Sequence, residues 1–264
     1  MHFHLADAYQ ETGSLLHRMD ARVKIVLAPL MILLIGLTPA GAFGAYVGFF
    51  ALVMAGAVVG RVSPWTVVRR SFVALPFAAA AVTLIFTVPG RSLGVVPLLG
   101  LPVSEAGLIR FASIIFKSML SVQVAVLLVL STHFTDMLWA MGALRVPRVL
   151  VAIISFMYRY AFVMADEALR LTRARDSRSA VIGGNPLRGR SVWFNASTTG
   201  RLIGSLFLRS FERSERVYQA MAARGYQGQI KRLSPPPLTF RDVALAAVPL
   251  LAGVALTVVA SLWS

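Results

Sequence analysis

The chain has 264 residues, of which 57% are hydrophobic and only 14% are charged. A soluble domain carries about 25% charged residues, and the apolar residues here fall in blocks of roughly 15–23, close to the ~20 that cross a bilayer as one helix; an ordinary water-soluble fold is therefore excluded. The 26 basic residues outnumber the 11 acidic ones and give a net charge of +15, an excess that is typical of the cytoplasmic loops of membrane proteins.

Five apolar segments are predicted to cross the membrane, and the charges between them predict their direction. The lead-in, residues 1–24, is polar, shows no cleavable signal peptide and ends in basic residues, which predicts a cytoplasmic N-terminus. The arginine-bearing loop 61–70 is then predicted inside, and the weakly charged loop 89–107 outside. The predicted spans are 25–37, Phe43–Val59, 71–88, 108–131 and 243–263.

A sixth apolar segment, 149–165, is long enough to span but contains Tyr158, Arg159 and Tyr160. If it crossed the membrane, the arginine-rich stretch 166–241 would lie outside, against the positive-inside bias. We therefore predict an interfacial or re-entrant helix at 149–165. The C-terminus is then outside.

The arginine-rich cytoplasmic segment is predicted to form two long amphipathic helices. The first runs from about 150 to 175 or 176, and the turn sequence Gly-Gly-Asn-Pro at 183–186 separates it from the second, at about 199–224. An apolar stripe at helical spacing on the second helix includes Phe207, Phe211 and Met221. Gly225 occupies the position of a C-terminal cap, and three prolines at 235–237 predict a stiff connector to the last span.

Each predicted cytoplasmic helix ends in an Ala-Arg unit followed by a small or polar residue. The first unit is Ala174-Arg175-Asp176, and the second is Ala223-Arg224-Gly225. A guanidinium forks to carboxylates and carbonyl groups, so two similar ends predict docking to a partner with two similar sites, such as a dimer. The alternative is that each arginine only caps the C-terminus of its own helix.

The sequence lacks the residues of an ATPase or an enzyme. It contains no Gly-x-x-x-x-Gly-Lys-Ser/Thr phosphate loop and no cysteine, so thiolate nucleophiles and cysteine-ligated metals are excluded. His2 and His4 lie in the polar lead-in, and a helix-start role is favoured for Asp136 beside His133. We therefore predict no catalytic residue, no metal site and no cofactor bound by this chain.

Three longer motifs resemble the transmembrane T component of energy-coupling factor (ECF) transporters. Residues 210–226, Ser-Phe-Glu-Arg-Ser-Glu-Arg-Val-Tyr-Gln-Ala-Met-Ala-Ala-Arg-Gly-Tyr, resemble that family's signature. Residues 14–24 resemble its lead into the first span, and 135–138 with 144–147 resemble the segment after its membrane bundle. The chain departs from the pattern at Ala21, where the family often has proline, and at Asp176, where glycine or serine is common.

The resemblance implies an all-α, L-shaped integral membrane protein with about five transmembrane helices and a cytoplasmic module of amphipathic coupling helices. The implied domains are the lead-in and spans 1–4 (1–131), the coupling helices and connectors (132–241) and the C-terminal span (242–264). Implied partners are two ABC-type ATPase subunits that hydrolyse ATP, a substrate-binding S component in the membrane and the lipid bilayer, without nucleic acid. The chain would lie in the cell (inner) membrane and transmit ATP-driven motion to the S component.

The resemblance also implies roles for individual residues. Asp7, Tyr9 and His17-Arg18 in the lead-in most resemble the cobalt subgroup, which implies cobalt uptake. Packing against the other coupling helix and the S component is implied for Phe207, Phe211 and Met221. Docking to the ATPases is implied for Ala174, Arg175, Asp176, Ala223, Arg224 and Gly225.

Two other functions are weighed against this one. A self-sufficient permease would bind its substrate in its own spans, where Lys117, Gln123 and scattered hydroxyl groups are the polar side chains available. A membrane-bound enzyme would need a catalytic cluster, for which His133 and Asp136 are the loose candidates. Substrate binding by the chain alone separates the first alternative from a coupling component.

Overall fold

The computed structural model divides the chain into two compact units. Among the described residues, the bundle unit comprises those from 12 to 144 and from 237 to 263, and the hairpin unit comprises those from 145 to 228. Residues 132–144 are in the bundle unit, and the predicted domain boundaries at 131/132 and 241/242 stay a prediction. The structure describes residues 12–76, 80–89, 92–95, 102–179, 192–228 and 237–263.

The bundle unit begins with one short helix and two long ones. In α1 (Leu15–Arg18) the Ser14 hydroxyl accepts a hydrogen bond from the His17 backbone N–H. α2 (Ala21–Leu37) begins after Asp20, whose carboxylate accepts from the Arg22 N–H at 2.8 Å. α3 (Phe43–Val59) follows, and both long helices have 17 residues, the lower limit for a span. Both segments are helices, as predicted, with α2 beginning at Ala21 instead of 25; that they cross the membrane stays a prediction.

The predicted third span, 71–88, is not one continuous helix in the described part of the chain. Its described residues include the end of α4 (Pro64–Ser71), the 3-10 turn η1 (Phe72–Ala74), a second 3-10 turn η2 (Ala80–Thr83) and α6 (Leu84–Thr87). Pro76 lacks an N–H donor, and its ring clashes with the carbonyl four residues earlier, that of Phe72. The prediction of a single helix was wrong; Pro76 weakens helical hydrogen bonding at the break, although α2 and α11 continue as helices through Pro29 and Pro249.

A small hairpin interrupts the otherwise helical fold before the next helix. β1 (Ser92–Val95) pairs antiparallel with β2 (Pro102–Ser104), with Ser92 opposite Ser104. α7 (Glu105–Ser131) follows at once, capped by the Ser104 hydroxyl, and α8 (Phe134–Ala143) carries Asp136 in its first turn, as predicted. The bundle unit closes with α11 (Phe240–Trp263). Apart from the strands β1 and β2, the all-α class is confirmed.

Three of the described helices are long and apolar enough to cross a membrane. They are α7, α11 and α9 (Arg148–Ser179), and α3 is a shorter apolar helix. These helices confirm an integral membrane protein. The segment 149–165 is part of α9, one continuous helix; its predicted interfacial placement stays a prediction, because length and composition allow α9 to span.

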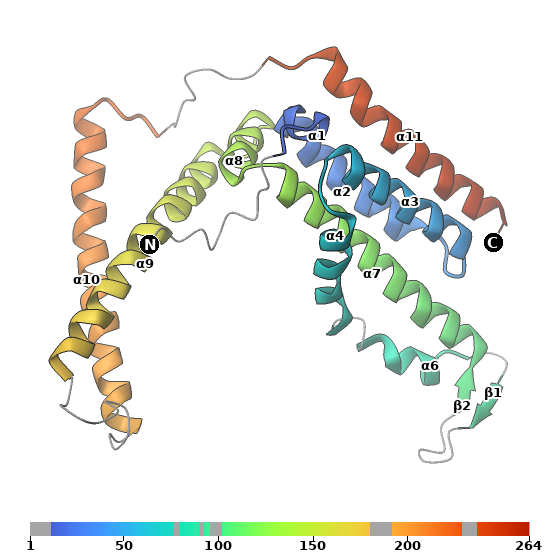
Figure 1. Cartoon of the computed structure of the whole chain (residues 1–264), viewed down its shortest axis with the longest axis horizontal. Helices are drawn as coiled ribbons and strands as arrows, with labels where there is room; N and C mark the ends of the chain where they lie inside the picture. Colours follow the sequence, from blue (N-terminus) through green and yellow to red (C-terminus); the bar gives the residue numbers. More distant parts are fainter. Residues whose placement is uncertain are drawn as a thin grey trace. The chain divides into compact units, whose positions relative to one another are not determined.

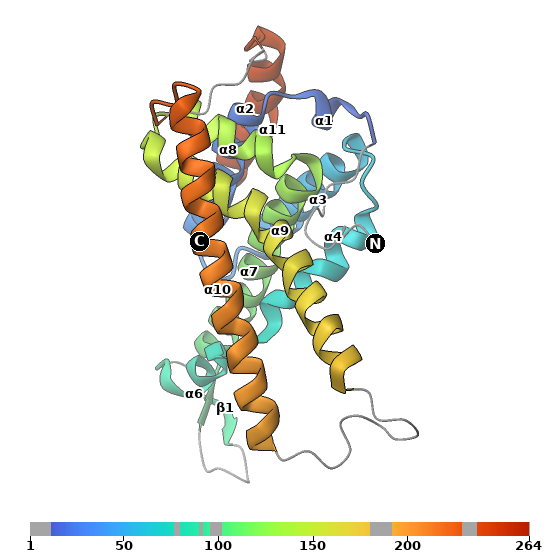
Figure 2. The same cartoon turned by 90° about the vertical axis from the view of Figure 1, so that its left-hand side faces the viewer.

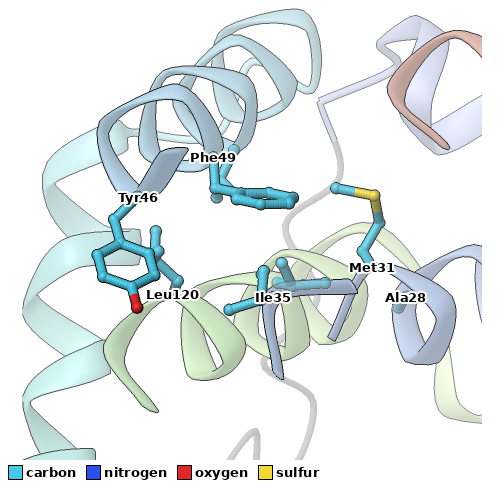
Figure 3. Packing of buried hydrophobic residues seen from close by; sticks show 8 residues of the cluster. Ala28, Met31, Ile35, Tyr46, Phe49 and Leu120 are labelled. Atoms are coloured by element: carbon cyan, nitrogen blue, oxygen red, sulfur yellow. The ribbon is translucent and has the colours of Figure 1, made fainter. Parts of the chain in front are cut away.

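The core of the bundle unit lies where α2, α3 and α7 meet (Figure 3). Ile35 of α2 and Phe49 of α3 are 0% exposed, and Met31, Tyr46 and Leu120 are also buried. Figure 3 shows Phe49 reaching from α3 toward Met31 of α2, with Leu120 of α7 on the other side of Ile35. The core residues therefore come from three predicted spans.

Glycines on α3 allow this close packing. A Cβ at Gly48 would lie 2.7 Å from the Leu256 side chain of α11, and one at Gly56 would lie 3.2 Å from Leu127 of α7. Gly44 has open space around it. Two of the three glycines, Gly48 and Gly56, therefore lie where a neighbouring helix packs closely, as small residues do between membrane helices.

Two lysines join α2 and α7 in a reciprocal way. Lys24, near the start of α2, donates from Nζ to the Ser131 carbonyl, the last residue of α7, at 2.9 Å. Lys117 of α7 donates to the carbonyls of Gly36 and Thr38 at the end of α2. The final carbonyls of a helix have no partner within it and carry partial negative charge. Each lysine therefore stabilises the C-terminus of the neighbouring, antiparallel helix.

The substitution Gly107→Ala is expected to destabilise the bundle unit by about 2 kcal/mol, within the usual range for overpacking. A Cβ there would lie 2.5 Å from the Leu84 carbonyl oxygen and 2.9 Å from the Ile85 Cα, both backbone atoms of α6. Unfolding of the purified chain in denaturant measures the change. Gly44→Ala, in open space, is the control, and an equal loss in both variants would contradict this explanation.

The hairpin unit is built from α9 and α10 (Val192–Ala223), which run antiparallel (Figures 1 and 2). Both predicted long helices are confirmed, although α10 begins seven residues before the predicted start at 199. The rings of Phe156 on α9 and Tyr226, just after α10, meet edge to face with centroids 6.3 Å apart. The predicted turn at 183–186 and the first two prolines of the 235–237 connector lie outside the described residues.

Candidate functional site

The second Ala-Arg unit lies at the C-terminus of α10, in a cap that depends on glycine. The Tyr226 N–H donates to the Met221 carbonyl at 3.0 Å, and the Gly225 N–H donates to the Ala222 carbonyl at 2.9 Å, which is a Schellman motif. Gly225 has φ +79°, a conformation that side-chain-bearing residues rarely adopt. The cap is made by backbone groups alone, and Arg224 is exposed.

The first Ala-Arg unit lies one turn inside its helix, because α9 continues to Ser179. The Arg175 side chain is 26% exposed, and its Nε lies 3.4 Å from Oδ1 of Asp176. Its Nη1 donates to Oγ1 of Thr199 on α10 at 3.5 Å. The prediction that this unit ends its helix was wrong, since Asp176 does not enter the left-handed conformation that stops α10 at Gly225.

The two arginines lie at opposite ends of the α9–α10 pair. Arg175 is beside Thr199, near the start of α10, and Arg224 follows the last residue of α10. At 1.5 Å per residue, the 25 residues from Thr199 to Arg224 span about 37 Å. The hairpin unit thus presents its two Ala-Arg units far apart, at separate places.

A basic groove lies between α9 and α10 at the Arg175 end, with a volume of about 670 Å³. Glu167 is the acidic residue in its lining, and its carboxylate binds Arg209 at 2.7 Å and Arg170 at 3.2 Å. The excess of guanidinium groups makes the groove attractive to carboxylates and other anions. Its lining consists of Glu167, Arg170, Leu171, Ala174, Arg175, Arg178, Thr198, Arg201, Leu202 and Arg209.

The apolar stripe of α10 does not face α9. Phe207 is 67% exposed and Phe211 is 66% exposed, while Met221 is half-buried. Leu202 and Arg209, two helical turns apart on another face of α10, line the groove toward α9. The predicted packing of Phe207 and Phe211 against the other coupling helix is absent from the hairpin unit, and their contact with an S component stays a prediction.

The lead-in motif, residues 14–24, forms a polar cluster at the start of α2. The structural role of this cluster was not indicated by the sequence. The Arg22 guanidinium lies over the ring of Trp139 on α8, with Cζ 4.2 Å from the ring centroid. Its Nε lies 3.8 Å from Oδ1 of Asp20, which is 6% exposed. Together with Lys24, these residues hold the start of α2 against the end of α7 and against α8. The Asp-x-Arg-x-Lys spacing at a helix start was the available signal.

Metal ligands do not gather in the described part of the bundle or of the hairpin. No group of three His, Cys, Asp or Glu side chains there is placed to hold a metal ion. His2 and His4 lie outside the described residues. His133 is the N-cap residue of α8, and Asp136 is in its first turn.

Comparison with protein families identifies the chain. The family model for cobalt transport protein, CbiQ, matches residues 12–235, which include the lead-in motif and both Ala-Arg units. The chain belongs to this family. The family consists of transporter membrane components and is not a family of enzymes, so this chain is the transmembrane component of a transporter and a multi-pass membrane protein.

Individual relatives agree with this assignment. The cobalt transport protein CbiQ of Rhodobacter capsulatus is 29% identical over 163 residues, which cover 62% of this chain and 60% of that protein. The energy-coupling factor transporter transmembrane protein EcfT of Staphylococcus aureus is 25% identical over 235 residues, covering 86% and 85%. The nickel permease LarQ of Lactiplantibacillus plantarum is 27% identical over 113 residues, covering 43% and 38%.

Proposed function

We propose that the chain is the energy-coupling component of an ECF-type importer, and that Arg224 docks to an ATPase subunit. The observation that carries this proposal is the cap of α10. Its backbone groups satisfy each other through Gly225, and the arginine at the helix end is exposed. Because backbone hydrogen bonds already cap the C-terminus of α10, the Arg224 side chain is not needed as a cap. Its fork of donors suits a groove lined by carboxylates and carbonyls.

The second docking residue is Arg175, at the other end of the same helix pair. The separation of about 37 Å along α10 supports contact with two ATPase subunits, one at each end. When the ATPases close on ATP, their two grooves approach each other, and the helices that they hold must move. The ATP is hydrolysed by these partner subunits, and this chain binds no cofactor.

The membrane orientation follows from the charges. The hairpin unit carries the basic groove, and basic residues are enriched on the cytoplasmic side of a cell (inner) membrane protein. The N-terminus and the coupling module are therefore cytoplasmic. A substrate-binding subunit lies beside the spans in the membrane, where it receives the motion of the hairpin unit.

The proposed substrate of the assembled transporter is the cobalt ion. The family description supports cobalt, as does the name of the relative from Rhodobacter capsulatus. A relative named for nickel matches a shorter part of the chain. The ion would be bound by the substrate-binding subunit, because this chain gathers no metal ligands in the residues that the structure describes.

Uptake by a reconstituted complex tests the proposal. The chain, two ATPase subunits and a substrate-binding membrane subunit are expected to import cobalt into vesicles only when all are present and ATP is supplied. Nickel and a vitamin serve as competing substrates. Tight cobalt binding by the purified chain alone, or uptake without the ATPases, would favour a self-sufficient permease and contradict the proposal.

A further inference from the structure

The short helix α4 of the bundle unit packs beside α7, at the end of that span helix (Figure 1). Val67 of α4 is 0% exposed and lies in one buried cluster with Ala57, near the end of α3, and Leu130, one residue before the end of α7. Because α7 is long and apolar enough to cross a membrane, its end marks the passage from the hydrocarbon core to the lipid headgroups. The residues around Val67 therefore lie at headgroup depth.

The two faces of α4 differ in character. Val67 and Ser71, four residues apart, are both 0% exposed and face the bundle. Trp65 and Arg69, also four residues apart, are exposed, Trp65 at 71%. Residues at this spacing share one face of a helix, and each of these two is about 3 Å along the axis from Val67. The outer face of α4 thus carries an indole ring and a guanidinium, and tryptophan is typical of the membrane–water interface.

Arg61, in the turn between α3 and α4, holds a strained backbone position. Its φ is +50°. The Val62 N–H donates to the Ala57 carbonyl and the Arg61 N–H to the Val58 carbonyl, both at 2.9 Å, a Schellman motif in which glycine usually holds the left-handed position. Gly60, one residue earlier, has an ordinary φ of −71°. The chain thus keeps an arginine where a glycine would remove the strain, and such strained residues gather at functional sites.

The charges of Arg61 and Arg69 are not neutralised within the described part of the chain, where the ion pairs involve other residues. Val62, which follows Arg61, is 2% exposed and belongs to the same buried cluster as Val67. The two arginines therefore flank one cluster. Backbone hydrogen bonds already cap α3, so the Arg61 side chain is not needed there. Two uncompensated guanidinium groups at headgroup depth favour a bound anion, and phosphate oxygens accept their hydrogen bonds well.

Apolar side chains next to these arginines favour a lipid over a soluble anion. Phe72 is 50% exposed and Val73 is 68% exposed, and both follow α4 directly in η1. The chain continues from there into the predicted third span, so these side chains lie on the hydrocarbon side of the arginines. A soluble phosphate would leave them uncovered. A phospholipid covers them with its acyl chains while its headgroup meets the arginines, and anionic headgroups attract basic residues at the membrane surface.

We propose that Arg61, Trp65 and Arg69 form a binding site for the headgroup of an anionic phospholipid, whose acyl chains lie against Phe72 and Val73. The bound lipid holds the turn between α3 and α4 at the membrane surface. The site needs only a chain that crosses a membrane, so it goes beyond the proposed coupling role.

Tryptophan fluorescence of the full chain in nanodiscs tests the kind of headgroup. Trp65→Phe removes one of the four tryptophans, so the quenching by spin-labelled phospholipid that this variant loses belongs to Trp65. Spin-labelled phosphatidylglycerol is expected to quench Trp65 at a several-fold lower mole fraction than spin-labelled phosphatidylcholine. Equal quenching by the two lipids would overturn the proposal. Loss of the difference on addition of glycerol phosphate would also overturn it, by identifying a site for soluble anions.

Neutral variants of two neighbouring arginines test the geometry. Arg69→Gln is expected to lower the preference for phosphatidylglycerol about fivefold, the factor that about 1 kcal/mol per basic residue at an anionic surface gives. Arg70→Gln is the matched control, because Arg70 is turned about 100° from Arg69 around α4, and it should lower the preference much less. Equal losses in the two variants would indicate a diffuse attraction of charge and would overturn a defined site.

Arg61→Gly separates lipid binding from folding. In nonionic detergent without anionic lipid, the thermal midpoint of the chain should rise slightly, because glycine adopts the left-handed conformation without strain. In nanodiscs the preference for phosphatidylglycerol should fall about fivefold. Arg145→Gly is the control, since Arg145 is also exposed and has φ +67°; it should give a similar rise in midpoint and keep the preference.

A lower midpoint for Arg61→Gly would assign its side chain to the fold, and an unchanged lipid preference would remove it from the site; either result overturns the proposal. Failure of the wild-type chain to assemble with ATPase subunits would instead overturn the proposed function, and the lipid measurements on the chain would stand.

Discussion

Arg224→Glu is expected to abolish uptake and to weaken retention of the ATPase subunits by about 100-fold or more. The loss of one partner of a hydrogen-bonded charge pair at an interface costs about 2–5 kcal/mol, and the reversed charge adds repulsion from carboxylates in the groove. The fold itself should change little, because Arg224 is exposed and the cap is made by backbone groups. Co-purification of tagged chain with both ATPases measures the effect.

Two further variants separate docking from capping and from net charge. If Arg224 only complemented the dipole of α10, its reversal would lower stability by about 1 kcal/mol and leave the ATPases bound. Arg70→Glu, at an exposed position of α4 in the bundle unit, changes net charge equally and should retain assembly. Equal losses in Arg224→Glu and Arg70→Glu would contradict a specific contact.

Arg175→Glu is expected to behave differently from Arg224→Glu. The Arg175 guanidinium is partly buried and already contacts Asp176 and Thr199. Its reversal should therefore loosen the α9–α10 hairpin as well as weaken ATPase binding. A drop in thermal stability for Arg175→Glu, with none for Arg224→Glu, would mark this difference between the two ends.

The long helices could be predicted from the sequence because their signal is local. Apolar blocks located α2, α3, α7 and α11, and amphipathic spacing located α9 and α10. The end of α10 was predicted correctly because Gly225 supplies the φ value that its cap requires. In α9 the corresponding position is Asp176, not glycine, and the helix continues to Ser179. The prediction that the first Ala-Arg unit ends its helix was therefore wrong.

The remaining errors concern contacts between helices and local breaks. The sequence shows the apolar stripe that includes Phe207 and Phe211. It does not show which face of α10 contacts α9, because that face depends on how the two helices are aligned against each other. The predicted third span, 71–88, contains Pro76 and does not form a single helix. Helical spacing alone also could not indicate that Lys24 and Lys117, 93 residues apart, would reach each other's helix ends.

Lys24→Met is expected to lower the free energy of unfolding of the chain by about 3 kcal/mol, the lower end of the range for removing one partner from a buried charged group. Lys24 is 4% exposed, and its Nζ donates to the carbonyls of Ser131 at 2.9 Å and His17 at 3.5 Å. The charges of Asp136 and Asp20 act on it from α8 and from the start of α2. Without the lysine, the Ser131 carbonyl loses its donor, and the buried Asp20 carboxylate keeps only the Arg22 guanidinium at 3.8 Å.

Lys117→Met provides the matched comparison, because Lys117 makes the same kind of contact at the other end of the α2–α7 pair. It donates to the Gly36 and Thr38 carbonyls but is only half-buried, and no acidic side chain in the described part of the chain acts on it. Its loss should cost about 1–2 kcal/mol, the usual value of a hydrogen bond from a charged donor. Denaturant unfolding of both variants measures the difference. If Lys117→Met proved as damaging as Lys24→Met, helix-end contacts alone would explain both lysines, and the carboxylates around Lys24 would contribute nothing to the bundle.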